Sequence, residues 1–557
     1  MLKGVKPVAL IVAVAALPLA FCHQPKTPPI KADLVLSNGN IVTVDDELPR
    51  AQAVAISGNR IIYVGDDQGV KSFIGEATKV IDLGQKLVIP GLIDAHLHPF
   101  SAGRALTILD LKGLTKEQIL EKVALKVKEL KKGEWVEAEG WDQGFWKDKE
   151  FPTRSELDAV APDNPASLSR IDGHSGWYNS LAFRLSGIGR TTQDPEGGRI
   201  LRDANGEPTG MLVDAAMSLI KRERDGRSLE RNETYIKLEM EQYRKWGLTG
   251  IQDAGADEDS LQVYEKLRQR GELTVRVYAM VSADSDAFAA ALRQGPRVGD
   301  FLTERSIKML IDGALGSRGA LLFEPYSDAP DTSGLQMMKE EEAYSIIKRS
   351  LEKGFQVSAH AIGDKAVHIM LNLYKRALEE NPVKDPRLRI EHASVIRRDD
   401  LPAFREMNVI ACMQPIFVGE YGRWSEDRLG PQRVKDVLIL RDLLDAGVRI
   451  AGGTDCPASD SGNPILNFYA AVARKSPFGV PQEWYGRQKI TREEALRMLT
   501  IGAAYAAFEE DKKGSLEAGK LADLVVLDRD IMTVDVEQIP DTEVVLTVLD
   551  GKIIYSR

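Results

Sequence analysis

Residues at both ends of the chain alternate between apolar and polar positions. In residues 32–88, short β-branched runs are separated by turns rich in Ser, Asn and Gly at 37–40 and 57–60. Residues 505–557 show the same pattern of short apolar runs and turns, including an Asp-Gly-Lys turn at 550–552. Alternation of this kind around Asn and Gly is typical of β-hairpins. We therefore predict one small β-sandwich domain, formed from 32–88 and 505–557 together.

The central part, residues 89–504, alternates apolar strand patterns with helical patterns, which indicates βαβ units and a parallel sheet. Eight apolar segments end in polar or charged residues, as expected of parallel strands that are buried on both faces. These segments are 88–97, 249–254, 275–281, 307–312, 356–360, 389–392, 409–414 and 449–454. Eight is the number that a closed barrel requires. We therefore predict an α/β fold with a (β/α)₈ TIM-like barrel.

A long stretch between the first and second segments interrupts this alternation. It is rich in aromatic residues and glycine around 135–146 and 166–180. We interpret residues 105–240 as a large insertion after the first strand, on the catalytic face, where it would form a lid or a substrate-binding subdomain. The alternative is that the insertion contains a barrel strand, for instance at 166–171.

Composition and charge narrow the range of partners. The chain has 557 residues, 43% of them hydrophobic and 28% charged, with a formal net charge of −10. This acidity argues against nucleic acid or an anionic membrane surface as a partner, but it says nothing about small-molecule chemistry. The small-molecule substrate that we predict rests on the candidate site residues described below. Only three cysteines are present, which provides neither a disulfide framework nor a Cys-x-x-Cys zinc site. The oligomeric state stays open, with a homodimer among the options.

The first residues have the pattern of an export signal. Lys3 and Lys6 precede an apolar run at 8–21, which is shorter than a membrane span and is followed by Cys22. This arrangement resembles a bacterial lipoprotein processing site. We predict that residues 1–31 are a signal peptide and tether, and that the protein is exported as a periplasmic or membrane-anchored lipoprotein. Membrane contact would then occur only through the lipid anchor. The alternatives are an uncleaved anchor or a misassigned start.

The strongest chemical motif, Pro-Gly-Leu-Ile-Asp-Ala-His-Leu-His at 90–98, ends the first predicted barrel strand. Residues i and i+2 of a strand point to the same side, so His96 and His98 would both face the barrel mouth. Barrel active sites form at the carboxyl ends of the strands. A His-x-His pair alone is a weak signal, because such pairs also occur by chance on surfaces. At this position, the two imidazoles could bind one metal ion.

Three later strand ends carry further side chains that can bind metal. His360, His392 and Asp455 each stand at the carboxyl end of a predicted barrel strand. Neutral imidazole and carboxylate are suitable ligands for zinc and similar ions. A buried histidine is often only a hydrogen-bonded structural residue, but that explanation fits poorly when several such residues stand at strand ends.

Lys308 lies inside another apolar strand, where an unpaired ammonium group is costly. Burial lowers the pKa of lysine, and the neutral amine can take up CO₂ to form a carbamate. The two oxygens of a carbamate could bridge two metal ions. The alternative is a salt bridge to a carboxylate such as Asp312 or Asp455, and the residues alone leave both interpretations open.

In combination, these residues resemble the amidohydrolase superfamily, in particular the branch that contains N-substituted formamide deformylase. The resemblance runs from about residue 32 to 557. Its motifs are Gly-Leu-Ile-Asp-Ala-His-Leu-His at 91–98, Gly-Trp-Asp at 140–142, Asp-Gly-His-Ser at 172–175, Asp-Gly-Ala-Leu-Gly-Ser at 312–317, Glu-His-Ala at 391–393, Gly-Thr-Asp at 453–455 and a tail at 514–523. The resemblance implies a metal-binding barrel together with a β-sandwich of both chain ends.

The resemblance also implies a divalent metal cofactor, zinc by default, with one or two ions per chain. The implied ligands are His96, His98, Lys308, His360, His392 and Asp455. The first two histidines would bind the more buried ion, and the later two would bind the more exposed one. Lys308 would be the carboxylated lysine that bridges the ions. Asp455 would contact metal and shuttle protons.

The predicted function is metal-dependent hydrolysis of a carbon–nitrogen bond other than a peptide bond, such as an amide, formamide or cyclic amide. A metal-bridged water is hydroxide near neutral pH, and Asp455 would pass its proton to the leaving nitrogen. His174, inside the insertion, would contact the substrate or polarise its carbonyl; the alternative is a structural histidine in a glycine-rich turn. Hydrolysis of an ester, lactone or phosphoester remains a second reading, and a non-catalytic exported binding protein a third.

Overall fold

The computed structural model describes residues 1, 4, 30–143, 146–170, 175–195, 198–220, 229–478, 480 and 482–557. The proposed processing site at Cys22 and the candidate catalytic residue His174 lie outside the described residues. Within the described part of the chain, no helix combines the length and apolar character needed to span a membrane.

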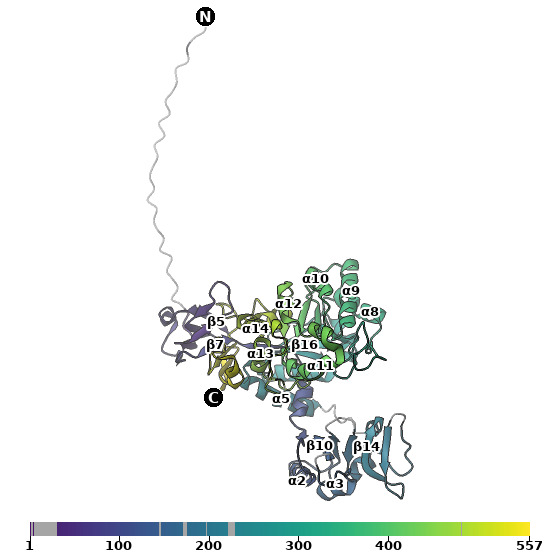
Figure 1. Ribbon diagram of the computed structural model, residues 1–557. Helices are drawn as coiled ribbons and strands as arrows, with labels where there is room; N and C mark the ends of the chain where they lie inside the picture. The colour runs from purple at the N-terminus through teal and green to yellow at the C-terminus, as the bar shows by residue number, and fades with distance from the viewer. Residues whose placement is uncertain are drawn as a thin grey trace.

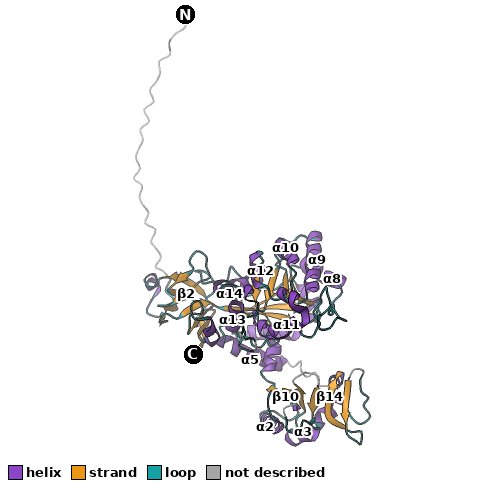
Figure 2. Ribbon diagram, in the orientation of Figure 1, coloured by secondary structure: helices purple, strands orange, loops and turns teal. Residues whose placement is uncertain are grey.

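Eight parallel strands form one sheet at the centre of the molecule (Figure 2). In sheet order they are β8 (Leu92–Leu97), β15 (Leu248–Ala256), β16 (Arg276–Ser282), β17 (Leu302–Leu310), β18 (Gln356–Ala361), β19 (Arg389–His392), β20 (Ile410–Met413) and β21 (Ile450–Gly452). The segment after β21 closes the sheet onto β8, because Asp455 N donates to His96 O at 2.7 Å and His98 N donates to Cys456 O at 2.9 Å. The predicted TIM-like α/β barrel is confirmed.

The segment 88–97, predicted as one barrel strand, is two strands in different sheets. β7 (Leu87–Pro90) pairs with β2 (Asn40–Val42) and β22 (Leu524–Leu527) outside the barrel, and only β8 pairs with β15. Gly91 lies at the break, where a Cβ would stand 2.1 Å from Thr249 Oγ1. Glycine therefore allows the chain to pass tightly from the outer sheet into the barrel. The continuous apolar run hid this crossing, because both strands are fully buried.

Helices surround the barrel and bury one face of each against the strands. They are α1 (Pro99–Ala105), α5 (Leu229–Lys245), α6 (Glu258–Gln269), α7 (Asp286–Gln294), α8 (Glu340–Glu352), α9 (Asp364–Glu380), α10 (Leu401–Glu406), α11 (Val418–Arg433), α12 (Leu440–Asp445), α13 (Pro464–Ala473), α14 (Arg492–Met498) and α15 (Ile501–Ala506). In α9, Val367, Met370, Leu371 and Tyr374 are buried at the three- and four-residue spacing of an amphipathic helix.

Strands from both chain ends form two further sheets. One contains β5 (Arg60–Gly65), β4 (Ala53–Ser57), β1 (Leu34–Ser37) and β6 (Lys79–Asp82). The other contains β24 (Lys552–Ser556), β23 (Val544–Leu549), β22 (Leu524–Leu527), β7, β2 (Asn40–Val42) and β3 (Arg50–Ala51). Buried side chains of both sheets share one apolar cluster, which includes Leu36 and Val54 from the first sheet and Val526 and Val548 from the second.

A fourth sheet lies between β8 and β15 in the sequence. In sheet order it contains β13 (Gly198–Arg202), β14 (Pro208–Asp214), β12 (Ser175–Tyr178), β11 (Ala166–Arg170), β10 (Val136–Trp141) and β9 (Leu109–Asp110), and it is accompanied by α2 (Lys116–Val127), α3 (Arg154–Val160) and α4 (Ser180–Ser186). Figure 1 shows these elements apart from the barrel, beyond α5. β11 pairs with β10 and β12, so the described residues 166–170 do not supply a barrel strand.

Candidate metal centre

The alternation of β8 places Asp94 and His96 on the same side of the strand, and His98 directly follows its end. His96 is completely buried, whereas the His98 side chain is about 36% exposed at the barrel mouth. Where the first and last barrel strands meet, Asp94 accepts hydrogen bonds from Thr454 Oγ1 at 2.6 Å and from His96 N at 3.0 Å. Asp94 therefore holds the start of the His-x-His motif against the segment that carries Asp455.

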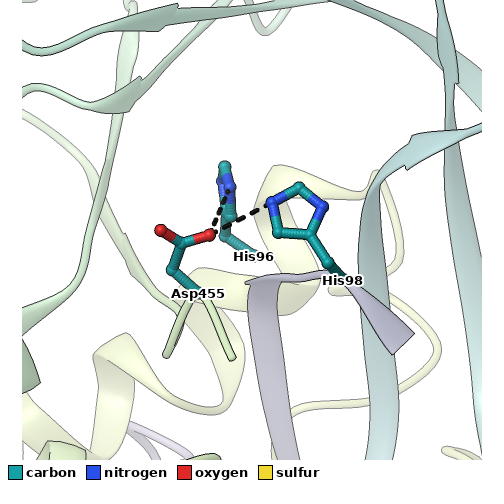
Figure 3. Close-up of side chains that lie close together, drawn as sticks. All are labelled: His96, His98 and Asp455. Atoms are coloured by element: carbon teal, nitrogen blue, oxygen red, sulfur yellow. Dashed lines mark ion pairs between the residues drawn. The ribbon is translucent and has the colours of Figure 1, made fainter. Parts of the chain in front are cut away.

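One oxygen of the Asp455 carboxylate faces both histidines of this motif (Figure 3). Asp455 Oδ1 is 3.4 Å from His96 Nε2 and 3.2 Å from His98 Nε2. Asp455 adopts a left-handed backbone conformation with φ of 61°, which is uncommon for a residue other than glycine. Such a conformation is found where the surrounding structure holds a functional side chain in place.

Two further histidines complete a row of imidazoles across the mouth. The ring centroids of His96 and His392 are 4.6 Å apart, and those of His392 and His360 are 4.5 Å apart. His392 Nδ1 lies 3.0 Å from Gln414 Oε1. An amide oxygen only accepts, so Nδ1 carries the proton in the neutral ring and Nε2 keeps its lone pair.

Lys308, on β17, is the buried cation of this region. Its side chain is only 2% exposed, and burial lowers its pKa although the charges of Glu391 and Asp455 oppose this effect. Among the described residues, no carboxylate forms an ion pair with Lys308. Asp312 instead accepts hydrogen bonds from backbone N–H groups. The salt bridge considered from the sequence is therefore not formed.

Burial also sets the charge of three of the histidines. It lowers the pKa of His98 and of His360, and it lowers the pKa of His392 to about 3. These three rings are therefore neutral at physiological pH. A neutral imidazole has the free lone pair that a metal ligand requires.

Asp455 and His96 are shifted in the opposite directions. Burial raises the pKa of Asp455, but the close approach of the His96 and His98 imidazoles outweighs burial and holds it well below its ordinary value. For His96, burial lowers the pKa, but Asp455 and Glu391 outweigh burial and raise it. Asp455 is therefore an anion that faces the row of imidazoles.

Unpaired buried atoms test whether these residues suit a metal ion. His96 Nε2, His360 Nε2 and Asp455 Oδ1 are all buried without a hydrogen-bond partner among the described residues. Each such atom costs about 1–3 kcal/mol. The nearest ligand atoms of His96, His98 and Asp455 all lie within 4.8 Å of one another. Two imidazole nitrogens and a carboxylate at this spacing fit a divalent cation, which would satisfy the unpaired atoms.

Sequence reasoning missed Glu391, which contacts the centre directly. Its Oε2 lies 2.5 Å from His96 Nδ1, and both side chains are fully buried. Glu391 precedes His392, and neighbouring residues of a regular strand point to opposite sides. The φ of 71° at His392 and of 44° at Ala393 breaks the alternation, so both side chains face the interior. The available signal was Arg389-Ile-Glu391, which places two opposite charges at i and i+2 of an apolar strand.

Trp141, in the Gly-Trp-Asp motif, and Arg318, which follows the 312–317 motif, have structural partners. Trp141 is fully buried in the fourth sheet and donates from Nε1 to Leu168 O at 2.8 Å. Arg318 forms a two-pronged ion pair with Asp328, with distances of 3.1 and 2.9 Å. Neither side chain therefore points to a role in substrate binding.

A parallel eight-stranded barrel with histidines and an aspartate at the carboxyl ends of its strands defines the class of barrel-shaped metal-dependent hydrolases. The sequence matches the Amidohydrolase family over residues 79–555, and the chain belongs to this family. The resemblance to the amidohydrolase superfamily is thus confirmed, and with it the dependence on a divalent metal ion.

Similar proteins span nearly the whole chain. Protein LONG AFTER FAR-RED 3 of Arabidopsis thaliana is 35% identical over 542 residues, which cover 93% of this chain and 92% of that protein. N-substituted formamide deformylase of Arthrobacter pascens is 30% identical over 543 residues, which cover 94% and 98%. The crystal structure of an uncharacterized metal-dependent hydrolase from Pyrococcus furiosus matches with a TM-score of 0.76 and 29% identity, covering 90% of this chain and all of that one.

Proposed function

We propose that this chain hydrolyses a carbon–nitrogen bond other than a peptide bond, in an amide, formamide or cyclic amide. The observation that carries the proposal is the set of buried, unpaired atoms on His96, His360 and Asp455, all at the carboxyl ends of barrel strands. They suit a hydrolytic metal rather than a structural one, because His98 leaves the site open to the barrel mouth. The similarity to a formamide deformylase supports the bond type.

We propose zinc as the metal, with one or two ions per chain. The ligand set proposed for it consists of His96, His98, Lys308, His360, His392 and Asp455. Imidazole nitrogen and carboxylate oxygen are common zinc ligands, and the neutral state of three of the histidines favours binding. When bound, a divalent metal ion would supply Lewis acidity, which polarises a carbonyl and acidifies water.

Lys308 would contribute as a carbamate. Its ammonium group would first lose one proton, which burial favours. The neutral amine would then attack the carbon of CO₂, so that a nitrogen–carbon bond forms while one carbon–oxygen π bond breaks, and a second proton would leave the nitrogen for solvent. The product is an anion with two oxygens in place of a buried cation. Because no carboxylate neutralises Lys308 among the described residues, this reaction would also remove an unpaired positive charge from the barrel interior.

Asp455 would move the proton of the reaction. Its carboxylate is ionised and faces the mouth, so it can orient water and accept a proton from it. The same oxygen can then donate that proton to the leaving nitrogen, which must be protonated before the carbon–nitrogen bond breaks. His98, at 3.2 Å from Asp455 Oδ1, would hold the carboxylate in place during this transfer.

The remaining parts would act around this centre. We propose that the insertion, residues 105–240, contributes to substrate selection and that His174 contacts the substrate. We also propose that residues 32–88 and 505–557 form a β-sandwich domain that supports the barrel, residues 89–504. Residues 1–31 would direct export, with a lipid on Cys22.

A substrate panel tests the bond type. Purified protein loaded with zinc is assayed against formamides, amides, cyclic amides, esters, lactones and phosphoesters. We expect turnover of at least one compound with a carbon–nitrogen bond, loss of turnover after chelation, and recovery after zinc is restored. Asp455→Asn should abolish turnover. His368→Ala should not, because His368 lies on outer helix α9 and pairs with Asp400. Turnover of esters alone would contradict the proposal.

Metal analysis tests the carbamate. We expect lower metal content in Lys308→Ala than in the parent, and a carbamate carbon signal in the parent after incubation with ¹³C-labelled bicarbonate. The exposed Lys375→Ala variant is the control and should match the parent. Unchanged metal content and activity in Lys308→Ala would show that the carbamate bridge is wrong.

A further inference from the structure

We propose that Arg389 and Glu391 are positioning residues for His96: the buried ion pair holds the proton of His96 on Nδ1 and thereby presents Nε2 to the metal centre. This inference rests on the proposed metal site and deepens it. Neither residue would touch the metal or the substrate. They would determine which ring nitrogen binds and how the ring is oriented.

The contact between Glu391 and His96 determines the tautomer. Glu391 Oε2 lies 2.5 Å from His96 Nδ1, and both side chains have no exposed surface. An ionised carboxylate can only accept a hydrogen bond, so Nδ1 must be the donor. The nitrogen on the opposite side of the ring, Nε2, is one of the unpaired buried atoms and lies beside Asp455. The nitrogen that needs a metal is therefore the one that the contact leaves available.

Arg389 makes a buried carboxylate at this place tolerable. Its Nε donates to Glu391 Oε1 at 2.7 Å, and its Nη2 donates to Glu391 Oε2 at 3.1 Å. A carboxylate removed from water is costly unless it is paired and hydrogen-bonded. The two-pronged contact supplies both the charge and the hydrogen bonds, and it fixes the plane of the carboxylate that faces His96.

The same guanidinium also fixes the backbone next to His96. Arg389 Nη2 donates to Ala95 O at 2.8 Å, and Nη1 donates to Gln252 Oε1. β19, which carries Arg389, is separated from β8 by β20 and β21 in the sheet order, so this contact crosses the barrel interior. One arginine therefore restrains both the ring of His96, through Glu391, and the strand from which it projects.

His392 shows that a charged partner is not required merely to bury an imidazole here. Its Nδ1 contacts the neutral amide oxygen of Gln414 at 3.0 Å. A carboxylate partner, unlike an amide, makes the imidazole a stronger electron donor, and such partners of metal-binding histidines raise metal affinity. The charged partner belongs to His96, the most deeply buried of the proposed ligands in the His-x-His motif.

The test compares Glu391→Gln with a matched variant, Glu510→Gln, in which the glutamate also pairs with a nearby arginine. Arg387, just before β19, forms a similar two-pronged pair with Glu510, at 2.7 and 2.6 Å, and none of the described histidines pairs with Glu510. We expect zinc affinity, measured by competition with a chromophoric chelator, to fall roughly 10- to 100-fold in Glu391→Gln. Glu510→Gln should keep the parental affinity. Equal affinity in Glu391→Gln and the parent, or an equal loss in both variants, would overturn the proposal.

A spectroscopic signature separates positioning from a purely structural role. The chain has only seven histidines, so ¹⁵N-histidine labelling gives a small set of ring signals. The strong hydrogen bond to Glu391 should give a low-field Nδ1–H proton signal in the parent protein that His96→Gln removes, whereas a signal from the His368–Asp400 pair should remain. Because this signal is measured in the parent protein, the test does not depend on whether a variant at position 391 folds. Absence of the signal in the parent would overturn the proposal.

Both measurements work without a substrate. If the protein bound zinc tightly and showed the His96 signal but hydrolysed no compound of the panel, the proposed reaction would fail and this inference would stand. If the panel succeeded while Glu391→Gln bound zinc as tightly as the parent, the reaction would stand and this inference would fail.

Discussion

At the residue scale, Glu239 on α5 is a buried carboxyl group outside the metal centre. Its side chain is only 2% exposed, and Oε2 has no hydrogen-bond partner among the described residues. Burial raises its pKa to about 7, and Tyr243 one turn away opposes this shift only in part. The folded protein therefore keeps this proton at pH values where the unfolded chain has lost it.

Glu239→Gln should change the pH dependence of stability. Because the folded pKa is raised from 4.5 to about 7, stability falls as pH rises through this window. Glutamine stays neutral, so the variant should gain up to about 3 kcal/mol over the parent above pH 7 and little near pH 4. Thermal unfolding at several pH values measures this difference. The exposed Glu230→Gln on the same helix is the control, and a constant difference between Glu239→Gln and the parent would contradict the prediction.

At the element scale, the loop after β17 depends on one carboxylate. Asp312 accepts hydrogen bonds from Leu321 N at 2.9 Å, Ile362 N at 3.0 Å and Gly363 N at 2.8 Å. Its side chain is fully buried, so water cannot readily replace it as the acceptor for these backbone N–H groups. Asp312 thereby joins the ends of β17 and β18, which carry Lys308 and His360.

Asp312→Ala should destabilise the protein by about 3 kcal/mol or more, because it leaves three buried N–H groups unpaired at about 1–3 kcal/mol each before relaxation. Asp312→Asn keeps one acceptor oxygen and should fall between Ala and the parent. Thermal unfolding gives the order of the three proteins, and proteolysis within 313–336 reports on the loop itself. Equal stability of the alanine variant and the parent would be inconsistent with this role.

The same scale shows what the sequence could predict. Strand ends were predictable because each apolar run ends in polar residues. Parallel strands bring those ends together, and the structure brings His96, His98 and Asp455 into one cluster. Two features depend on local backbone geometry that the pattern does not encode. The left-handed conformation at His392 turns Glu391 into a partner of His96. The crossing at Gly91 lies within an unbroken apolar run.

At the scale of the whole molecule, the sequence indicates the order of the sheets along the chain but not where the fourth sheet lies relative to the barrel. The fourth sheet has its own core, in which Trp141 stacks on Trp146 and meets Trp177 edge to face. Because these apolar residues pack against one another, their pattern in the sequence does not indicate where the sheet lies relative to the barrel. The sheets of the chain ends differ, since β7 leads directly into β8 and so must lie at the start of the barrel.

Arg276 joins the barrel to the sheet of the chain ends. It begins β16 and donates from Nε to Asp523 Oδ2 at 2.7 Å and from Nη2 to Asp550 Oδ1 at 2.9 Å. Arg276 and Asp523 are 2% and 3% exposed, so both charges depend on each other for compensation. The pair is buried between parts of the chain that lie about 250 residues apart in sequence.

Arg276→Met should therefore destabilise the protein by about 3–5 kcal/mol, because it leaves Asp523 buried without a counter-charge. Asp523→Asn should also destabilise the protein, because it leaves Asp550 as the remaining counter-charge of the Arg276 guanidinium. The double variant Arg276→Met/Asp523→Asn removes both buried charges and should be more stable than the sum of the single effects predicts, with a coupling of about 0.5–3 kcal/mol. Denaturant unfolding of the four proteins measures the coupling. Zinc affinity should stay parental in all of them, since the pair lies at the amino end of the strands, opposite the metal centre. Strict additivity would mean that the two charges do not stabilise each other and that this contact does not hold the barrel against the sheet.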